Sequence, residues 1–220
     1  MGSKKLTGSM LVFGPLLGII MVFVEPGGTD EDAFAVVAQT MLDNSAQAII
    51  SMVGFTVAML ATTIGTAYLA RSMQGEEKPG SDLAGLASVL AFLSAGVVIV
   101  SVGIEMIIYD SMWTDQGGDA TNAIAIGEAV SRNIFMFMGV SAVLLGIAIF
   151  RQKNLNQIVG VITALFGACI SVGSLASTFM TSSGSENIGG LIWFIGFLGF
   201  PIMTTATVFL TLRSAGKDAT

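Results

Sequence analysis

The chain lacks histidine and has a single cysteine, and these two features narrow its chemistry. Among its 220 residues, Cys169 is the only cysteine and no histidine occurs. Without imidazole, the chain has no histidine base and no imidazole ligand for haem, copper or another transition metal. One cysteine cannot form an intrachain disulfide or a thiolate cluster, and Cys169 lies in an apolar run, where a small packing residue is expected. We therefore expect a non-catalytic protein with no cofactor and no metal.

Charged residues are also scarce, at 11% of the chain, whereas 53% of the residues are apolar. About a quarter of the residues of a soluble domain are charged, so this composition is typical of a membrane protein. The net charge of −6 argues against nucleic acid as a partner. The expected partners are membrane lipids, together with other membrane protein subunits or a second copy of the chain.

Six apolar runs are long enough to cross a bilayer as helices, which takes about 20 residues. They predict an all-α, six-span bundle of three hairpins in one membrane domain, residues 1–220. The runs are Leu6–Val24, Ser45–Ala70, Leu83–Tyr109, Ile134–Phe150, Leu155–Phe179 and Ile188–Leu212.

The basic residues predict the orientation of the chain in the membrane. The chain has nine lysines and arginines, and basic residues near the ends of spans stay on the cytoplasmic side. In the six-span plan all but Arg132 fall on one side, so both termini are expected to be cytoplasmic in a multi-pass cell-membrane protein. The residues on that side are Lys4, Lys5, Arg71, Lys78, Arg151, Lys153, Arg213 and Lys217.

Two loops on the opposite, outer side each predict a short amphipathic helix. Residues 29–42 start with Thr29 as a helix cap and place apolar residues on one stripe. The second loop, "GGDATNAIAIGEAVSRN", has the same plan, with Thr121 as a candidate cap and Asn133 directly before a span, as Asn44 is in the first loop. The order of span, surface helix and span therefore occurs twice and suggests an internal repeat.

One carboxylate, Glu105, falls inside a span, near its outer end. An ionisable group facing lipid is costly, so we expect Glu105 to face the bundle or a wet vestibule. Arg132, the outer-side base, begins the next span and could form an ion pair that fastens the two spans. Alternatively, Glu105 binds a cation or a proton at the mouth of a cavity.

Hydroxyl side chains in the last two spans are candidates for a polar lining. Serines recur every third residue in the fifth span, and threonines gather in the sixth. The alternative is that these hydroxyls bond to helix carbonyls, as they commonly do in membrane helices. The candidate lining residues are Ser171, Ser174, Ser177, Thr204 and Thr205.

Three features are similar to those of a known family: the six-span plan, the "AYLARSM" end of the second span, and the segment from Arg132 through "GVSAVLLGIAIF" to a basic turn. In these features the chain resembles a family of small prokaryotic integral membrane proteins known only as a domain of unknown function. This resemblance implies a fold and no activity.

Three functions from different classes remain. The first is a non-catalytic accessory or interaction subunit of a larger assembly, because the chain has packing motifs and no reactive constellation. The second is a small transporter or ligand-binding protein that uses Glu105 and the intramembrane hydroxyls. The third, the least favoured without histidine or a cysteine pair, is a membrane-embedded enzyme.

Overall fold

A computed structural model of the chain describes residues 4–26, 33–153 and 156–179, together with 191–192, 194–196 and 199. Its regular elements are all helical in this part of the chain. The helices are α1 (Lys4–Val24), α2 (Phe34–Asp43), α3 (Ser45–Ser72), α4 (Ser81–Met106), η1 (Ile107–Tyr109), α5 (Ser111–Asp115), α6 (Ala120–Gln152) and α7 (Gln157–Phe179).

Five of these helical segments are long and apolar enough to cross a membrane, by length and composition. They confirm the first five apolar runs as helices. The sixth run, Ile188–Leu212, lies almost entirely outside the described residues. The five candidate spans are Lys5–Val24, Ser45–Ser72, Ser81–Tyr109, Ala120–Gln152 and Gln157–Ala176.

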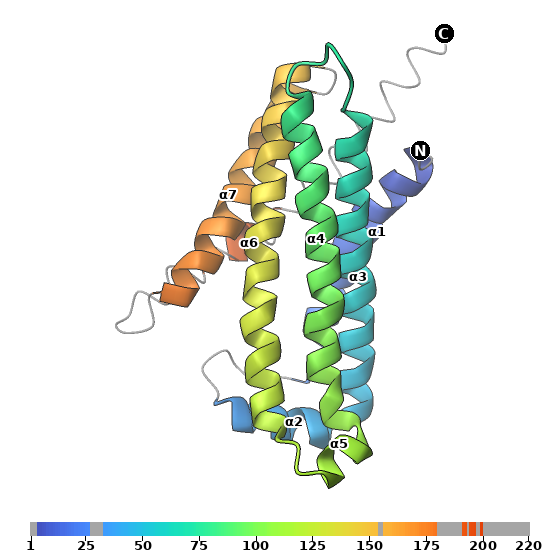
Figure 1. Ribbon diagram of the computed structural model, residues 1–220, viewed down its shortest axis with the longest axis vertical. Coiled ribbons are helices and arrows are strands. Elements are labelled where there is room, and N and C mark those ends of the chain that lie inside the picture. The colour runs from blue at the N-terminus through green and yellow to red at the C-terminus, as the bar shows by residue number, and fades with distance from the viewer. Residues whose placement is uncertain are drawn as a thin grey trace.

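The five long helices pack in chain order, with α1 on α3, α3 on α4, α4 on α6 and α6 on α7. Helices α3, α4 and α6 run side by side along the long axis, while α1 crosses behind α3 and α7 crosses behind α6 (Figure 1). Consecutive long helices run in opposite directions, so basic residues gather at one end of the array, together with Glu76, Glu77 and Asp82, and the other end carries acidic residues.

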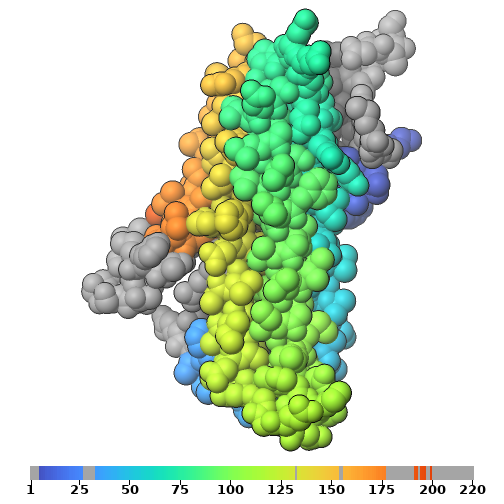
Figure 2. Space-filling view, viewed as in Figure 1, coloured from blue at the N-terminus to red at the C-terminus, as the bar shows by residue number. Residues whose placement is uncertain are grey.

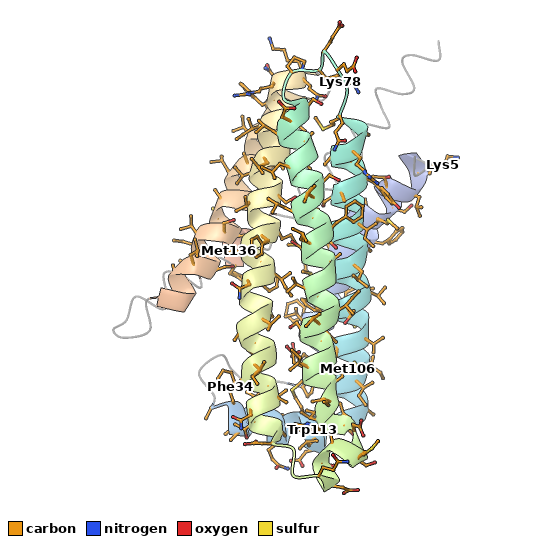
Figure 3. The ribbon with its side chains drawn as sticks, in the orientation of Figure 1. Lys5, Phe34, Lys78, Met106, Trp113 and Met136 are labelled. Atoms are coloured by element: carbon orange, nitrogen blue, oxygen red, sulfur yellow. The ribbon has the colours of Figure 1, made fainter. Side chains whose placement is uncertain are left out.

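We call these two regions the basic end and the acidic end. Lys5 and Lys78 lie toward the basic end, and Phe34 and Trp113 lie at the acidic end (Figure 3). The basic end carries Lys5, Arg71, Lys78, Arg151 and Lys153 near the helix termini, and the acidic end carries Glu25, Asp43, Asp110, Asp115, Asp119 and Glu128.

Small residues bring the helices close together. A Cβ added to Gly14 of α1 would lie 2.9 Å from the Ala58 oxygen of α3, and one added to Gly146 of α6 would lie 2.5 Å from the Gly160 oxygen of α7. Both glycines are therefore needed for backbone contact. Between α4 and α6 the same role falls to buried alanines of α4, namely Ala84, Ala87, Ala91 and Ala95.

The first surface helix is confirmed, but its predicted start is wrong. Helix α2 begins at Phe34, after Ala33, whose backbone is extended (φ −60°, ψ 142°) and which provides no side-chain cap. The candidate cap, Thr29, lies outside the described residues. Ala38 and Met41 are buried, whereas Phe34 is 38% exposed. The helix lies across the acidic end, where it contacts α6 and α3.

The second surface helix is wrong as a separate element. Residues 120–152 form one continuous helix, α6, and Asp119 caps it in place of Thr121 by accepting bonds from the backbone N–H groups of Thr121 and Asn122. Asn133 lies inside α6 and does not mark a helix boundary. Its side-chain amide donates to the Ala129 oxygen four residues earlier, at 3.2 Å. No proline or other strong helix breaker interrupts the segment, so it continues as helix. The proposed loop repeat therefore fails in its second copy.

The length of α6 explains where this segment lies. At a rise of about 1.5 Å per residue, its 33 residues span about 50 Å, compared with about 30 Å for the hydrocarbon core of a bilayer. The additional turns are at the acidic end, where α6 forms an apolar cluster with α2, α3 and η1. The buried members of this cluster are Ala38, Met41, Ala48, Met52, Ile108, Ala123 and Ile124.

Pro15 lies inside α1, and the helix continues through it from Lys4 to Val24. In a membrane helix, neighbouring helices and side chains can satisfy the carbonyl that a proline leaves without a donor.

Candidate functional site

Glu105 lies in the last turn of α4 (Ser81–Met106), at the acidic end, and is half-buried. Its side chain rests against the backbone of α6 at Gly127. A Cβ added to Gly127 would clash with Cγ of Glu105 and would lie 2.6 Å from its Oε1. The glycine therefore makes the space that the carboxylate occupies. This confirms that Glu105 faces the neighbouring helix, as the cost of exposing a carboxylate to lipid requires.

A serine hydroxyl links this carboxylate to α6. Ser101 lies one turn before Glu105 and is buried at 2% exposure. Its Oγ lies 3.0 Å from the Gly127 carbonyl oxygen and 3.3 Å from Oε1 of Glu105, and can donate to either acceptor. Because a hydroxyl has one hydrogen, it serves one of these two acceptors at a time. Ser101 thus connects α4 to α6 and positions the Glu105 carboxylate beside this connection.

The charged groups that act on Glu105 from neighbouring elements are also acidic. Glu128 of α6 follows Gly127, and Glu25 follows the last residue of α1; both interact repulsively with a charge on Glu105. Three carboxylates from three parts of the chain thus create a negative potential, which attracts cations to this end. Within the described residues, however, no group of three carboxylate or thiolate side chains is arranged to hold a metal ion.

Arg132 belongs to α6, but its side chain lies outside the described part of the structure. Its backbone position is five residues beyond Gly127, which on a helix with 3.6 residues per turn is about 140° around the axis and about 7.5 Å further along it. The ion pair between Arg132 and Glu105 therefore stays a prediction.

The predicted polar lining stays a prediction, because the structure describes the side chains of Ser171 and Ser174 alone among its five residues. The Ser171 hydroxyl donates to the Met136 oxygen of α6 at 3.0 Å, so this serine connects two helices. Ser174 is buried at 4% exposure. The side chain of Ser177, and all of Thr204 and Thr205, lie outside the described residues.

Other buried hydroxyls confirm the alternative of bonding to helix carbonyls. Thr62 donates to the Ala58 oxygen and Thr163 to the Val159 oxygen, each four residues earlier in its own helix, at 2.8 and 2.7 Å. Ser141 of α6 instead donates to the Ala87 oxygen of α4 at 2.8 Å, across a helix interface. These groups contribute to helix packing, and within the described residues they do not line a channel.

Sequence reasoning missed Gly127 and Ser101, although each has a signal. Ser101 precedes Glu105 by four residues, the spacing that places two side chains on one helix face. Gly127 interrupts an Ala/Ile segment that was expected to be a surface helix, where a glycine is unfavourable by about 1 kcal/mol relative to alanine. Such a glycine indicates a close approach by another group, which here is Glu105.

Two glycines of α4 behave differently from those at the helix contacts. A Cβ added to Gly96 or Gly103 would meet no atom within 4 Å. Both are exposed, and they lie seven residues apart on α4, which runs along the face shown in Figure 2. The same spacing separates Gly139 from Gly146 on α6 and Gly160 from Gly167 on α7. Those four glycines pack against one another's backbones, whereas the α4 pair faces outward.

No protein-family model, curated protein or solved structure matches this chain. The resemblance to a family of small six-span membrane proteins therefore stays a prediction.

Proposed function

We propose that this chain is a non-catalytic, multi-pass membrane protein that acts as an accessory subunit by binding a span of another membrane protein. The observation that carries this proposal is the outward face of α4, the middle helix of the row. That face is apolar and includes two glycines, Gly96 and Gly103, with open space beside them.

Glycine in a membrane helix lets a second helix come into close contact. Lipid is as apolar as leucine, so the association of spans relies on small residues that let backbones approach. Glycine in a helix costs about 1 kcal/mol relative to alanine, and at the α6/α7 contact that cost is offset by tight packing. A partner span on α4 would supply the same compensation for Gly96 and Gly103.

The exposed side chains around the two glycines are large and apolar. Because glycine has no side chain, they rise above the helix backbone at Gly96 and Gly103, and we call these two low positions the groove. Val89, Ile99 and Val100 are 55%, 58% and 55% exposed, respectively. A helix that docks here would place its own side chains over the glycines and between these exposed side chains. We assign this face to a different membrane protein, and treat a second copy of this chain as an outcome of the test.

Co-purification tests this proposal. Full-length tagged protein, expressed at its native level and extracted in mild detergent, should bring down a stoichiometric membrane protein. Gly96→Leu combined with Gly103→Leu should lose that partner at unchanged expression, whereas Val89→Leu with Val100→Leu, which adds bulk on the same face without filling the groove, should retain it. A wild-type protein isolated alone or as a homodimer, or a partner that survives the glycine substitutions, would refute the proposal.

The arrangement proposed for the membrane has six spans in three hairpins, with both termini in the cytoplasm. It is supported by the gathering of Lys5, Arg71, Lys78, Arg151 and Lys153 at one end of the helices, because basic residues are retained on the cytoplasmic side and acidic residues at that end contribute little to orientation. The basic end is then cytoplasmic, and the acidic end, with α2 and the extension of α6, is outside.

A transporter or ligand-binding protein is the second candidate function, and Glu105 is the observation that favours it. The carboxylate lies between two helices, and nearby Glu128 and Glu25 add negative charge. A cation or proton site of this kind predicts that wild-type protein in detergent is stabilised by added monovalent cations, and that Glu105→Gln abolishes this response without lowering basal stability.

The ion-pair alternative predicts a different pattern for the same residue. Glu105→Gln or Arg132→Gln alone should destabilise the protein, because either change leaves the other group unpaired. Combining the two changes should restore much of the loss, which thermal unfolding of all four proteins measures as a coupling free energy. Additive losses would exclude the pair.

A further inference from the structure

One arginine at the basic end lies over an aromatic ring. The guanidinium carbon of Arg71, in the last turn of α3 (Ser45–Ser72), is 5.5 Å from the centroid of the Phe92 ring of α4. Tyr68, one turn earlier in α3, meets the same ring in a T-shaped arrangement, with the ring centroids 6.3 Å apart. Because α3 and α4 run side by side (Figure 1), these three side chains join the two helices. We call them the arginine corner.

The guanidinium is directed back along α3, away from the connection that follows the helix. Phe92 lies eleven residues after Ser81, the first residue of α4, which is about 16 Å along the axis. Arg71, by contrast, is one residue from the end of α3. A helical side chain tilts toward the N-terminus of its helix, which gives the same direction. The charge of Arg71 therefore lies beside the apolar part of the helices.

The acidic residues of the basic end lie around the connection instead. Glu76, Glu77 and Asp82 surround it, together with Lys78. Arg71 is exposed, and its described contact is the aromatic ring of α4. An aromatic ring attracts a cation, but it has no oxygen to accept bonds from the five N–H groups of a guanidinium. The arginine corner can therefore receive an anion.

The face of α3 that carries Arg71 continues toward the acidic end as an apolar strip. At 3.6 residues per turn, Ile64, Val57 and Val53 lie within about 40° of Arg71 around the helix axis; we call these three residues the α3 strip. Val57 and Val53 are 53% and 45% exposed, whereas the neighbouring face of α3 packs on α1 at Ala58. Val57 is fourteen residues from Arg71, about 21 Å along the axis, which exceeds half of the roughly 30 Å hydrocarbon core. The strip is therefore long enough for the acyl chains of one leaflet.

We propose that the arginine corner binds the phosphate group of a phospholipid whose acyl chains lie on the α3 strip. A cation beside an apolar strip on one exposed face matches the two parts of such a lipid. Arginine suits the phosphate, because its planar group donates two parallel N–H bonds to the phosphate oxygens. A free phosphate ion would use the cation and leave the strip uncovered. The lipid lies on α3, whereas the groove proposed for a partner span lies on α4.

Thermal unfolding of the full-length protein in detergent tests this proposal with three additives. Dioleoyl phosphatidylglycerol should raise the midpoint of unfolding until the rise reaches a plateau. Dioleoylglycerol has the same acyl chains and no phosphate, and inorganic phosphate has no acyl chains, so each should give little of that rise. An equal rise with dioleoylglycerol would show that apolar chains bind without the arginine, and an equal rise with inorganic phosphate would show a free-anion site. Either result would overturn the proposal.

Variants of the corner should weaken the response to phosphatidylglycerol in a set order. Arg71→Gln should raise the lipid concentration that gives half of the rise by about tenfold, as expected for the loss of hydrogen bonds to a charged group. Arg71→Lys keeps the charge without the planar fork and should lie between Arg71→Gln and the wild type. Phe92→Leu keeps an apolar contact without the ring and should cost about threefold. Arg151→Gln is the matched control, because it removes an exposed arginine at the basic end from α6, and it should respond as the wild type does.

Two results with these variants would also overturn the proposal. One is a wild-type lipid response of Arg71→Gln, including the case in which this variant instead loses a co-purified membrane protein. The other is an equal loss in Arg71→Gln and Arg151→Gln, which would show that only the net charge matters. If Arg71→Gln does not fold, Arg71→Lys and Phe92→Leu provide the same test. The proposal is independent of the partner on α4, whose loss is measured by co-purification and not by the lipid response.

Discussion

The two ends of the helix row differ in the elements that form their buried clusters. At the basic end, the cluster is shared by α3, α4 and α6, and short connections join the helices. That cluster comprises Ala70, Met73, Ala84, Ala87, Leu145, Ala148 and Ile149. At the acidic end the cluster has a similar mixture of alanine, methionine and isoleucine, but an additional helix, α2, lies across the row and contributes to it.

The difference shows how the row accommodates its longest helix. Alanine lets helix backbones approach at both ends. At the basic end, Gln152 donates to the Met73 oxygen at 2.7 Å and joins the end of α6 to the end of α3. At the acidic end, α2 covers the additional turns of α6 by burying Ala38 and Met41. Four experiments test this difference between the ends.

The largest expected effect is all-or-none labelling of the two ends. Asp115 and Glu77 are both exposed, in the acidic-end and basic-end connections respectively. In a Cys169→Ser background, Asp115→Cys should react with an impermeant thiol reagent added to intact cells, because the proposed orientation places the acidic end outside. Glu77→Cys should react only after permeabilisation. Labelling of Glu77→Cys in intact cells would reverse the orientation.

Removing the apolar contact of α2 should give the next largest effect. Met41 is 4% exposed, and Met41→Ala should cost about 2–5 kcal/mol by leaving a cavity. A ten-residue helix is marginal by itself in water, so the loss should appear as faster hydrogen exchange within Phe34–Asp43. Leu42→Ala, at a position 38% exposed, is the matched control and should change exchange little. Equal effects would show that α2 does not depend on its buried face.

Adding one methyl group at each of two glycines should have opposite effects. Gly127→Ala should destabilise the protein by about 1–3 kcal/mol, because its Cβ would overlap the Glu105 side chain and overpacking costs this much. Gly103→Ala should stabilise it by up to about 1 kcal/mol, since alanine favours helix and its Cβ meets open space. Thermal unfolding in detergent measures both. Unchanged thermal stability of Gly127→Ala would refute the described contact between Glu105 and Gly127.

The smallest expected effect is at the basic end, where Lys153 follows α6 in the left-handed region with φ 54°. A residue with a Cβ pays about 1–2 kcal/mol in this conformation, and glycine does not. Lys153→Gly should therefore raise the stability by about 1 kcal/mol, less the cost of its greater freedom in the unfolded chain. Lys153→Ala keeps the Cβ and should give no gain. Denaturant unfolding of both variants in mixed micelles provides the measurement.

Apolar run length predicted the helices well where a run coincided with one helix. The first run was expected at Leu6–Val24 and α1 covers Lys4–Val24, while the second was expected from Ser45, where α3 begins. The fourth run was expected to begin at Ile134, yet α6 begins at Ala120. Hydropathy marks where a helix can be in lipid, and it does not mark where a helix ends in water.

The candidate site was predicted only in part. A carboxylate in an apolar run is visible in the sequence, so Glu105 was identified together with its need to face another helix. Its contacts were not, because Gly127 lies 22 residues away and belongs to a segment that was assigned to a surface helix. Gly127 is the α6 residue that faces α4 at the level of Glu105. Which residue of α6 faces α4 depends on how the two helices pack.

By itself, the sequence determined the apolar, membrane-type character of this protein, the positions of its first five long helices apart from the start of α6, and the gathering of its basic residues at one end. These properties follow from composition and run length, because the transfer of apolar and charged groups into lipid is decided residue by residue. The tertiary structure decided that α6 continues unbroken to the acidic end, that α2 lies across it and that Glu105 sits against Gly127. Those outcomes depend on which helix faces meet, and contacts between distant residues are set by packing across the whole array.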